Sequence, residues 1–404
     1  MIEKEMQMAR SYLSRLECTE CGGAFPADFV GAATCHPRGT LLARYDLAAA
    51  AREINREEIG TGPSSLWRYA SLLPVKDVRH AVSLVEGWTP LVNAARLGDL
   101  LGCAVLYIKD EGRNPTGSFK DRGATVGVSR YRELGIDAVI LNSSGNAGAA
   151  WSVYSARAGM HCVSIVPRDI QPASLSQCAL AGAETYVIED WHRSGSVVAE
   201  LAAEHGWLNV GTLKEPYRIE GKKTIGYELA EQLGWKMPDV IFYPLGGGTG
   251  AIAIWKAFEE LQALGWVHGR VPRLFITQYE GCAPVVRAFQ EEAEDCTPWR
   301  NINIPPGGLK SPNPPGGKQV LRLIRGTGGG ALAVSTAQAL DAVARLAREE
   351  GVFACPESAT TLAGLTMALE RGLVSKGESV VLISTGSGLK SVPSLPVPSL
   401  KTVG

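Results

Sequence analysis

Apolar and polar positions follow a repeating block pattern along most of the chain. From Thr89 onward, short apolar runs rich in β-branched residues end in turns rich in glycine or serine, and an amphipathic stretch follows most of these turns. The clearest runs are 104–108, 138–142, 161–167, 239–245 and 379–384. Short apolar runs predict buried strands and amphipathic stretches predict helices, so their alternation predicts an α/β fold with mainly parallel sheets. In such folds ligands bind beyond the carboxyl ends of the strands, where these turns lie.

Two segments depart from this pattern. Residues 41–85 show no sustained periodicity and are interpreted as an irregular lead-in. Residues 303–319, "NIPPGGLKSPNPPGGKQ", are rich in proline and glycine, which predicts a loop. This loop is either a flexible cover over a site or a solvated insertion.

The composition limits the class of protein. A length of 404 residues is enough for two domains. With a formal net charge of -1 and no basic cluster, nucleic acids and anionic membranes are not expected as partners. The nine cysteines are mostly scattered, which favours a reducing compartment. Residues 1–18 lack the apolar core of a signal peptide. No apolar run is long enough to span a membrane. We therefore expect a cytoplasmic protein that acts on a small molecule.

The opening segment contains half of a zinc-binding pattern. Cys18 and Cys21 have the Cys-x-x-Cys spacing of a zinc knuckle. Only Cys35 and the adjacent His36 could complete the ligand set, and neighbouring residues rarely occupy two corners of one tetrahedron. Residues 1–45 are therefore interpreted as a degenerate zinc-knuckle-like segment with free thiols, and no metal is expected.

Lys120 occupies a turn where a charged lysine is unfavourable. It lies in "NPTGSFKDRG" (114–123), between an apolar run and a predicted helix, so the positive end of the helix dipole repels its ammonium group. A lysine that condenses with a carbonyl loses this charge, which is typical of a Schiff-base lysine. The alternative from these residues alone is an ordinary solvated lysine in a loop.

Three further turns carry groups that bind anions or polar rings. Residues 143–148, "SSGNAG", combine hydroxyls, an amide and backbone N–H groups at a helix start, which suits a carboxylate. Residues 246–250, "GGGTG", lack the Lys-Ser/Thr of a nucleotide P-loop and the acidic residue of a dinucleotide site, so a phosphomonoester fits better. Residues 384–388, "STGSG", end the last apolar run and offer the hydroxyl of Thr385. Each of these turns, taken alone, could be structural only.

Together the four turns supply the parts that hold pyridoxal phosphate (PLP): a lysine, an asparagine, a phosphate cradle and a hydroxyl. The lysine turn resembles that of the fold type II, or β-family, PLP-dependent enzymes, and its form "NPTGSFKDRG" resembles the threonine synthases. The resemblance extends over nearly the whole chain through "CTECG" (18–22), "EGWTPL" (86–91), "PYRIEGKKT" (216–224), "PESATT" (356–361) and "TGSGLK" (385–390).

The resemblance implies a role for each matching residue. Lys120 binds PLP covalently and moves protons, Asn146 bonds the phenolic oxygen, and Thr385 faces the pyridine nitrogen. The PLP phosphate is held by Gly246, Gly247, Gly248, Thr249 and Gly250. The place of the substrate carboxylate is lined by Ser143, Ser144 and Ala147, and a substrate anion is within reach of Lys109 and Arg218.

The resemblance also implies a fold, that of the tryptophan synthase β subunit, with PLP in the cleft between two α/β domains. On this division, residues 46–124 and 216–404 form a large PLP-binding domain, and residues 125–215 form a small mobile domain. The family further suggests a homodimer.

The substrate half of the site departs from the family pattern. Threonine synthases carry an "NSxNPxR" segment, whereas this chain has "TLKEPYR" (212–218), with Thr212 and Leu213 in place of the Asn-Ser pair. Glu215 adds a negative charge, which predicts a weaker site for a phosphate dianion. The alternative is that Lys214, Arg218 and Lys222 hold the substrate phosphate instead.

The activity implied by the resemblance is that of a PLP-dependent carbon–oxygen lyase, which converts O-phosphohomoserine and water to threonine and phosphate. A serine/threonine ammonia-lyase acting by β-elimination needs no site for a substrate phosphate, and neither does an enzyme of β-replacement. The altered segment therefore leaves both alternatives open. A paralogue that binds PLP without strong catalysis is disfavoured by the intact Lys120.

Overall fold

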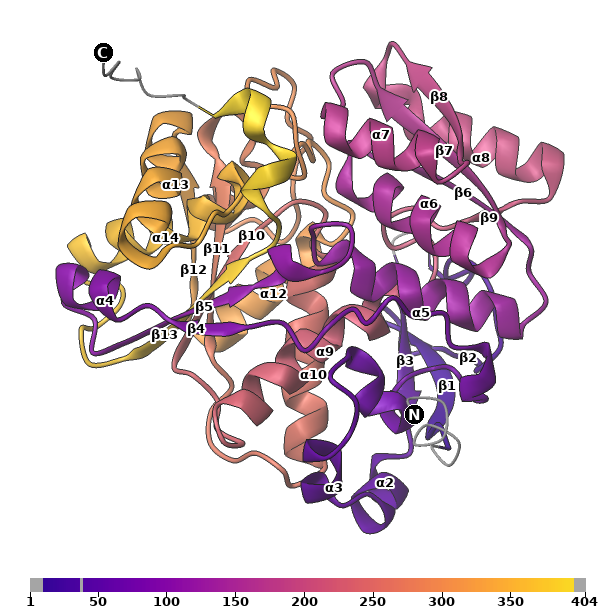
Figure 1. Cartoon of the computed structure of the whole chain (residues 1–404), viewed down its shortest axis with the longest axis horizontal. Helices are drawn as coiled ribbons and strands as arrows, with labels where there is room; N and C mark the ends of the chain where they lie inside the picture. Colours follow the sequence, from indigo (N-terminus) through magenta and orange to yellow (C-terminus); the bar gives the residue numbers. More distant parts are fainter. Residues whose placement is uncertain (1–9, 37–38, 396–404) are drawn as a thin grey trace, which may run out of the picture.

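The computed structural model describes residues 10–36 and 39–395, and its strands form three sheets (Figure 1). The largest sheet has the strand order β12-β11-β10-β13-β5-β4. Its strands are β4 (Leu91–Asn93), β5 (Val105–Asp110), β10 (Val240–Pro244), β11 (Arg273–Tyr279), β12 (Gly330–Val334) and β13 (Ser379–Ser384). Its neighbouring strands are parallel except for β4 and β5, which are antiparallel.

A second sheet of four parallel strands has the order β8-β7-β6-β9. Its strands are β6 (Ala138–Asn142), β7 (His161–Pro167), β8 (Glu184–Ile188) and β9 (Leu208–Asn209). The N-terminal segment forms a small antiparallel sheet of order β2-β1-β3, with β1 (Leu13–Cys18), β2 (Ala24–Pro26) and β3 (Leu41–Tyr45).

Helices cover the two larger sheets. The early ones are α2 (Leu47–Glu53), α3 (Arg56–Gly60), α4 (Ala95–Leu101), α5 (Lys120–Glu133), α6 (Asn146–Ala158), α7 (Pro172–Leu180) and α8 (Ser194–His205). The later ones are α9 (Tyr217–Gln232), α10 (Thr249–Ala263), α11 (Pro284–Gln290), α12 (Gly317–Thr327), α13 (Thr336–Glu350) and α14 (Pro356–Glu370). Figure 1 shows α6, α7 and α8 around the four-stranded sheet. Across the described ranges, none of these helices is long and apolar enough to cross a membrane.

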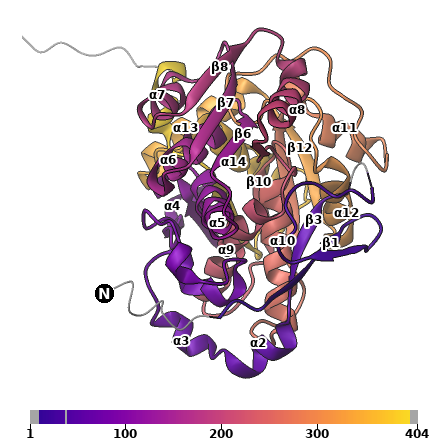
Figure 2. The ribbon, with the colours of Figure 1, turned by 90° about the vertical axis from the view of Figure 1, so that its right-hand side faces the viewer.

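Helix α9 is central to the packing because glycines let its neighbours approach closely. Its residues from Tyr217 to Ala230 are all buried. A Cβ atom at Gly221 would lie 1.7 Å from the Arg122 carbonyl oxygen of α5, and one at Gly226 would lie 2.6 Å from Ala257 of α10. The close contact with α9 fixes the start of α5, which Figure 2 views nearly end-on. Lys120 is the first residue of that helix.

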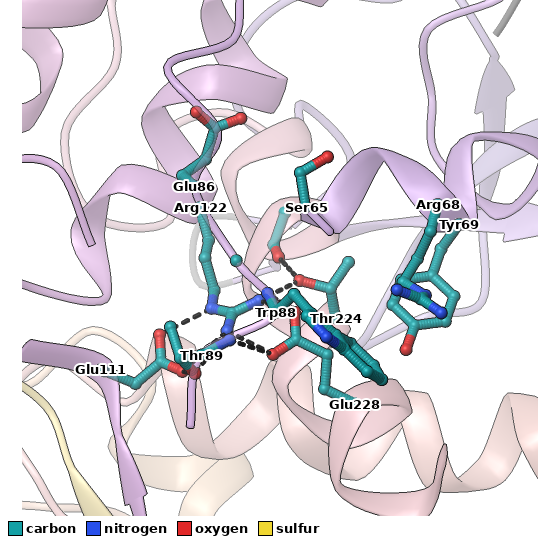
Figure 3. Close-up of polar contacts among 12 residues, drawn as sticks. Ser65, Arg68, Tyr69, Glu86, Trp88, Thr89, Glu111, Arg122, Thr224 and Glu228 are labelled. Atoms are coloured by element: carbon teal, nitrogen blue, oxygen red, sulfur yellow. Dashed lines mark hydrogen bonds and ion pairs between the residues drawn. The ribbon is translucent and has the colours of Figure 1, made fainter. Parts of the chain in front are cut away.

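A buried network of charges joins β5, α5 and α9. Arg122 Nε lies 2.6 Å from Glu111 Oε2, its Nη1 lies 2.5 Å from Glu228 Oε1, and all three side chains are fully buried (Figure 3). Lys109 Nζ lies 2.7 Å from Glu228 Oε2. Burial alone would raise the pKa of Glu228, but Arg122 and Lys109 outweigh it and lower that pKa to about 2. The carboxylate of Glu228 therefore stays ionised near neutral pH and holds the segment before Lys120 against the central helix.

The structure confirms the predicted α/β class and the mainly parallel sheets. All five of the clearest predicted runs are strands, namely β5, β6, β7, β10 and β13, and only the ends of β5 and β10 differ from the predicted bounds. The interpretation of 41–85 as irregular is wrong between residues 41 and 60, where β3, α2 and α3 form. Strand β3 pairs with β1, which lies more than twenty residues earlier, so local periodicity could not reveal it. Strand β12 is an element that the pattern did not predict.

The division into two domains stays a prediction. All four strands of the smaller sheet lie within 125–215, while α5 spans the predicted boundary at residue 124. Residues 1–9, half of the segment considered for a signal peptide, lie outside the described ranges.

Candidate active site

Lys120 lies at the edge of the large sheet where the parallel strands β5 and β13 end. Enclosure by the protein lowers the pKa of Lys120 to about 7, and repulsion from Arg218 is the second cause. Nζ lies 4.2 Å from the ring centroid of Phe119. Within the described chain Lys120 forms no hydrogen bond or ion pair, and its side chain is partly accessible. It is therefore an available amine that is partly neutral near pH 7.

The turn before Lys120 is tied to the turn after β13. The Phe119 N–H donates to the Thr385 carbonyl over 3.0 Å. The Thr385 hydroxyl oxygen lies 3.3 Å from that of Ser358 in α14. Because neighbouring parallel strands end at the same edge of a sheet, two turns more than 250 residues apart in the sequence meet here.

The segment 246–250 forms a tight loop between β10 and α10. A Cβ atom at Gly246 would lie 2.5 Å from the Gly308 carbonyl oxygen, and one at Gly247 would lie 2.8 Å from Thr212 Cγ2. Both positions therefore require glycine. Because α10 begins at Thr249, the loop presents the first backbone N–H groups of a helix, which bind phosphate.

Lys222 is a buried cation beside this loop. Its Nζ donates to Thr249 Oγ1 over 2.9 Å, so it lies at the glycine loop rather than at the altered segment 212–215. Burial, followed by repulsion from Arg218 and Lys120, lowers its pKa well below the ordinary value. In the part of the chain that the structure describes, Lys222 has no ion-pair partner. A phosphate in the glycine loop would supply the missing negative charge.

The inner half of a cleft brings most of the predicted cofactor residues together. Its lining includes Lys120, Asn146, residues 246–249 and Thr385. Gly250 is not part of this lining, because it packs against Tyr243, whose hydroxyl oxygen would lie 1.8 Å from a Cβ atom there.

The sequence analysis missed several lining residues of the inner half, among them Cys355 and Glu357. Glu357 Oε1 accepts the Gly308 N–H over 3.1 Å. The segment "PESATT", which contains Glu357, was the signal that could have placed it here.

The outer half of the cleft contains the predicted carboxylate residues. Ser143, Ser144 and Ala147 line it at the start of α6, opposite Lys310 of the proline- and glycine-rich loop. The two halves share lining residues, namely Lys120, Asn146, Gly247 and Gly308, so they form one continuous cleft.

The loop 303–319 covers this cleft. Residues 310–313 and Pro315 line its outer half, and the Gly316 N–H donates to the Gly247 carbonyl over 3.0 Å. Ser144 Oγ donates to the Gly307 carbonyl over 3.2 Å, which links the loop to α6. Of the two interpretations, the solvated insertion is therefore wrong and the cover is confirmed.

Two predicted anion ligands do not face the cleft. Lys109 is fully buried in the charge network, where its Nζ also donates to the Thr89 carbonyl over 2.7 Å. Arg218 is buried too, and its Nη1 donates to the Val210 carbonyl over 2.5 Å. Neither residue is among the described lining of either half. Their proposed contact with a substrate anion is therefore corrected: Lys109 supports the fold, and Arg218 lies behind the cleft, where it acts on the pKa of Lys120.

The altered segment 212–215 weakens an anion site less than its sequence suggests. Leu213 adopts a left-handed φ of 59° and packs in the hydrophobic core, while Thr212 and Lys214 line the cleft. Glu215 is buried, and its Oε2 accepts the Tyr131 hydroxyl over 2.6 Å and the Tyr217 N–H over 2.7 Å. The leucine and the carboxylate therefore do not face a bound substrate.

These residues fit PLP. The glycine loop packs closely against Thr212 and the Gly308 carbonyl and ends at the first N–H groups of α10, and the buried Lys222 beside it lacks a counter-charge. The amine of Lys120 lines the inner half of the cleft and can react with the aldehyde of PLP. Asn146 and Thr385 line the same half with polar groups suited to the PLP ring.

Comparisons with known proteins agree with this fit. Residues 82–386 match the family described as pyridoxal-phosphate dependent enzyme. The threonine synthase of Methanocaldococcus jannaschii is 37% identical over 92% of this chain and 92% of that protein. The threonine synthase of Methanosarcina acetivorans is 37% identical over 93% of this chain and 92% of that protein.

Solved structures show the same fold. Threonine deaminase isoform 2 from Solanum lycopersicum has a TM-score of 0.63 at 21% identity, covering 76% of this chain and 82% of that chain. A pyridoxal 5'-phosphate-dependent aspartate racemase has a TM-score of 0.66 at 20% identity, covering 85% of this chain and 98% of that chain. With the family match and the close relatives, these similarities show that the chain belongs to the pyridoxal-phosphate dependent enzymes and, within them, to the threonine synthase family.

Proposed function

We propose that this chain converts O-phosphohomoserine and water to threonine and phosphate. The charge of the outer half of the cleft supports this reaction most directly. The described residues that line it include the lysines Lys120, Lys214 and Lys310 but no aspartate or glutamate. Serine or threonine would bring one carboxylate, whereas O-phosphohomoserine also brings a phosphate dianion, and a surplus of cations favours the second. An ammonia-lyase acting on serine or threonine does not need these additional cationic side chains.

The side chains of the cleft carry out the proton transfers. Bound PLP supplies an electron sink for the charge that develops at the substrate carbon atoms. Lys120 Nζ would move the protons: one leaves Cα, a second leaves Cβ as phosphate departs from Cγ, and one returns to Cγ, which becomes the methyl carbon. The hydroxyl of water is then added at Cβ, a proton returns to Cα, and the other proton of the water leaves with the phosphate. A pKa of about 7 suits Lys120 to accept and release protons near neutral pH.

The two ends of the substrate have separate partners in this proposal. Its carboxylate binds at the start of α6, where Ser143 Oγ accepts the Gly148 N–H over 2.8 Å and keeps the turn in shape. Its phosphate binds between Lys214 and Lys310, which line the outer half. Lys310 Nζ also pairs with Asp169 Oδ2 at 2.7 Å, so Lys214 is the cation expected to respond most to the substrate.

A substrate screen tests the proposed reaction. The PLP-loaded protein is incubated separately with O-phosphohomoserine, serine and threonine, and the products are identified by mass spectrometry. We expect equal amounts of free phosphate and threonine from O-phosphohomoserine. Release of a 2-oxo acid and ammonia from serine or threonine, with no phosphate released from O-phosphohomoserine, would instead identify an ammonia-lyase.

Lys214→Met is expected to raise KM for O-phosphohomoserine by about 10- to 100-fold, because it removes a charge-assisted hydrogen bond to the phosphate. Steady-state kinetics measure this change. Lys236→Met is the matched control, because Lys236 is exposed and is not among the described lining residues of the cleft. An unchanged KM in Lys214→Met would remove this lysine from the phosphate site.

Gly246→Ala is expected to weaken PLP binding by at least about tenfold, because the new methyl group would clash with the Gly308 carbonyl and distort the phosphate loop. Equilibrium titration of the apoprotein with PLP measures the affinity. Gly377→Ala serves as control, since Gly377 is exposed and a Cβ atom there would meet nothing within 4 Å. Equal affinities in the two variants would contradict the assignment of the loop.

The rate of covalent attachment of PLP to the apoprotein is expected to rise with pH and to level off above about pH 7. Only the neutral amine of Lys120 attacks the aldehyde, and burial lowers the pKa of this amine to about 7. Stopped-flow absorbance across pH measures the rate. Arg218→Met removes the second cause of the shift and should move the midpoint to higher pH. A midpoint near the ordinary lysine value in the unmodified protein would refute the buried amine.

We also propose that the protein works as a cytoplasmic homodimer. All nine cysteines lie in the described ranges and none of them forms a disulfide there, which supports a reducing compartment. Leu389 is 72% exposed and Leu180 is 89% exposed, and α7 packs against the turn that carries Leu389, so these side chains offer an apolar surface for a second copy. Sedimentation equilibrium of the PLP-loaded protein tests the dimer, and a monomer at all accessible concentrations would exclude it.

A further inference from the structure

The N-terminal sheet brings the thiol of Cys35 to those of the Cys-x-x-Cys pair, Cys18 and Cys21. The sulfur atoms of Cys18, Cys21 and Cys35 all lie within 4.8 Å of one another, and those of Cys21 and Cys35 are 3.3 Å apart. Cys18 ends strand β1, Cys21 lies in the turn that leads to β2, and Cys35 comes from the loop before β3. The connection between β1 and β2 and the loop before β3 therefore converge on one point.

Neither core packing nor a disulfide explains all three thiols. Cys18 is buried and could be a small core residue, but Cys21 and Cys35 are exposed, where free cysteines are uncommon. A disulfide could use Cys21 and Cys35 but would leave Cys18 facing it without a role. Sulfur ligands at the corners of a zinc tetrahedron, about 2.3 Å from the ion, lie about 3.8 Å apart. The observed cluster is close to that spacing, so a metal accounts for all three side chains at once.

Glycines let the backbone pass close to the thiols. A Cβ atom at Gly39 would lie 2.4 Å from Cys18 Sγ, and one at Gly23 would lie 3.3 Å from Cys21 Sγ. The Gly22 N–H donates to the Cys18 carbonyl over 2.9 Å, and the Cys18 N–H donates to the Gly23 carbonyl over 3.0 Å. These bonds close the tight turn that a Cys-x-x-Cys pair needs to aim both sulfurs at one ion.

We propose that Cys18, Cys21 and Cys35 bind a zinc ion through their thiolates, with solvent at the fourth corner of the tetrahedron. His36 does not belong to the group of mutually close ligand atoms among the described residues. The proposal replaces the expectation of a degenerate knuckle without metal. That expectation came from counting ligands in the sequence, whereas three converging thiolates are enough to hold zinc when water supplies the fourth ligand.

The site stabilises a turn that supports the cleft. Glu20, between the two cysteines of the turn, pairs with Lys318 at 2.7 Å and with Arg322 at 3.1 Å, both on α12. Thr19 Oγ1 accepts a hydrogen bond from Gln319 Nε2 over 3.1 Å. Helix α12 begins one residue after Gly316, whose N–H donates to Gly247 of the glycine loop. Figure 2 shows β1 and β3 beside α10 and α12. Zinc would thus fix the turn against the helix that leads to the loop covering the cleft.

Metal analysis of the full chain tests the proposal. The protein is purified under reducing conditions from zinc-supplemented cells, and its metal content is measured by mass spectrometry. We expect about one zinc ion per chain, and a thiolate-to-cobalt absorption band after exchange of zinc for cobalt. Cys21→Ser/Cys35→Ser changes only exposed positions and should hold no zinc while keeping its circular dichroism spectrum. Cys103→Ala, which removes a buried thiol away from the cluster, should bind zinc as the unmodified chain does.

A separate measurement tests whether zinc stabilises α12. Chelation of zinc from the unmodified protein is expected to raise amide hydrogen exchange in residues 317–327 at least severalfold, because the turn around Glu20 loses its anchor. Helix α14 forms none of the bonds to this turn described above, so amide hydrogen exchange in α14 is the internal control.

Two results would overturn the proposal. One is a fully reduced, unmodified chain that takes up no more zinc or cobalt than the double variant. The other is cobalt binding without a thiolate charge-transfer band, which would place the metal elsewhere. The cobalt titration needs no variant, so it decides the matter even if the double variant does not fold.

Discussion

Lys120→Ala is expected to abolish covalent attachment of PLP and to lower turnover of O-phosphohomoserine by more than about 10³-fold. The substitution removes both the amine proposed to bind the aldehyde and the base proposed to move the substrate protons. In this cleft Lys120 is the lysine with a pKa near 7 and no internal partner within the described chain. Borohydride reduction followed by peptide mass spectrometry measures the attachment, and product analysis measures turnover.

Two controls separate chemistry from charge. Lys120→Arg keeps a cation at the start of α5 but cannot form the same bond, so it should lose the label as completely as the alanine variant. Lys222→Met removes the neighbouring buried cation at Thr249 and should weaken PLP binding while leaving the label on Lys120. A pyridoxyl label on any other peptide of the unmodified protein would refute the assignment of Lys120.

Arg122→Leu is expected to lower the free energy of unfolding by about 3–5 kcal/mol, because it leaves the buried carboxylate of Glu111 without a cation and Glu228 with only Lys109. Figure 3 shows the guanidinium between these two carboxylates. Urea unfolding followed by tryptophan fluorescence measures the change. The start of α5 would also lose its anchor, so PLP binding should weaken in parallel.

The matched control for this prediction is Arg96→Leu. Arg96 also forms an ion pair, with Glu349 at 2.8 Å, but its side chain is 70% exposed, so the loss should stay within about 0.5 kcal/mol. Adding Glu111→Gln to Arg122→Leu should recover part of the stability, because the neutral amide no longer needs a counter-charge. An Arg122→Leu variant as stable as the Arg96→Leu variant would show that the buried network contributes little.

The cleft shows which features of a site can be predicted from short sequence segments and which depend on contacts between distant segments. The lysine turn, the glycine loop and Thr385 were predicted as cofactor groups, and the structure brings them to one cleft. Each lies at the end of an apolar run, and the ends of parallel strands meet at one sheet edge. Gly250 is the exception: it belongs to the same motif, but it packs against Tyr243 and does not line the cleft.

The orientation of individual side chains was harder to predict. Lys109 and Arg218 have the right charge for an anion site, yet both point into the protein, where Glu228 and the Val210 carbonyl hold them. Leu213 and Glu215 looked unfavourable for a phosphate, yet a left-handed backbone at Leu213 turns its side chain into the core. The rotation of a side chain about the backbone depends on its packing partners, which come from remote parts of the chain.

The sequence by itself determined the α/β class and the parallel sheets, and it singled out the lysine proposed to bind the cofactor and the loop proposed to hold its phosphate. These features follow from short-range periodicity and from turns whose chemistry is local. Only the tertiary structure decided which cations line the cleft, that the loop 303–319 covers it, and that Cys35 lies beside the Cys18–Cys21 pair. Those outcomes depend on contacts between segments far apart in the chain, and such contacts are fixed only when the whole core packs.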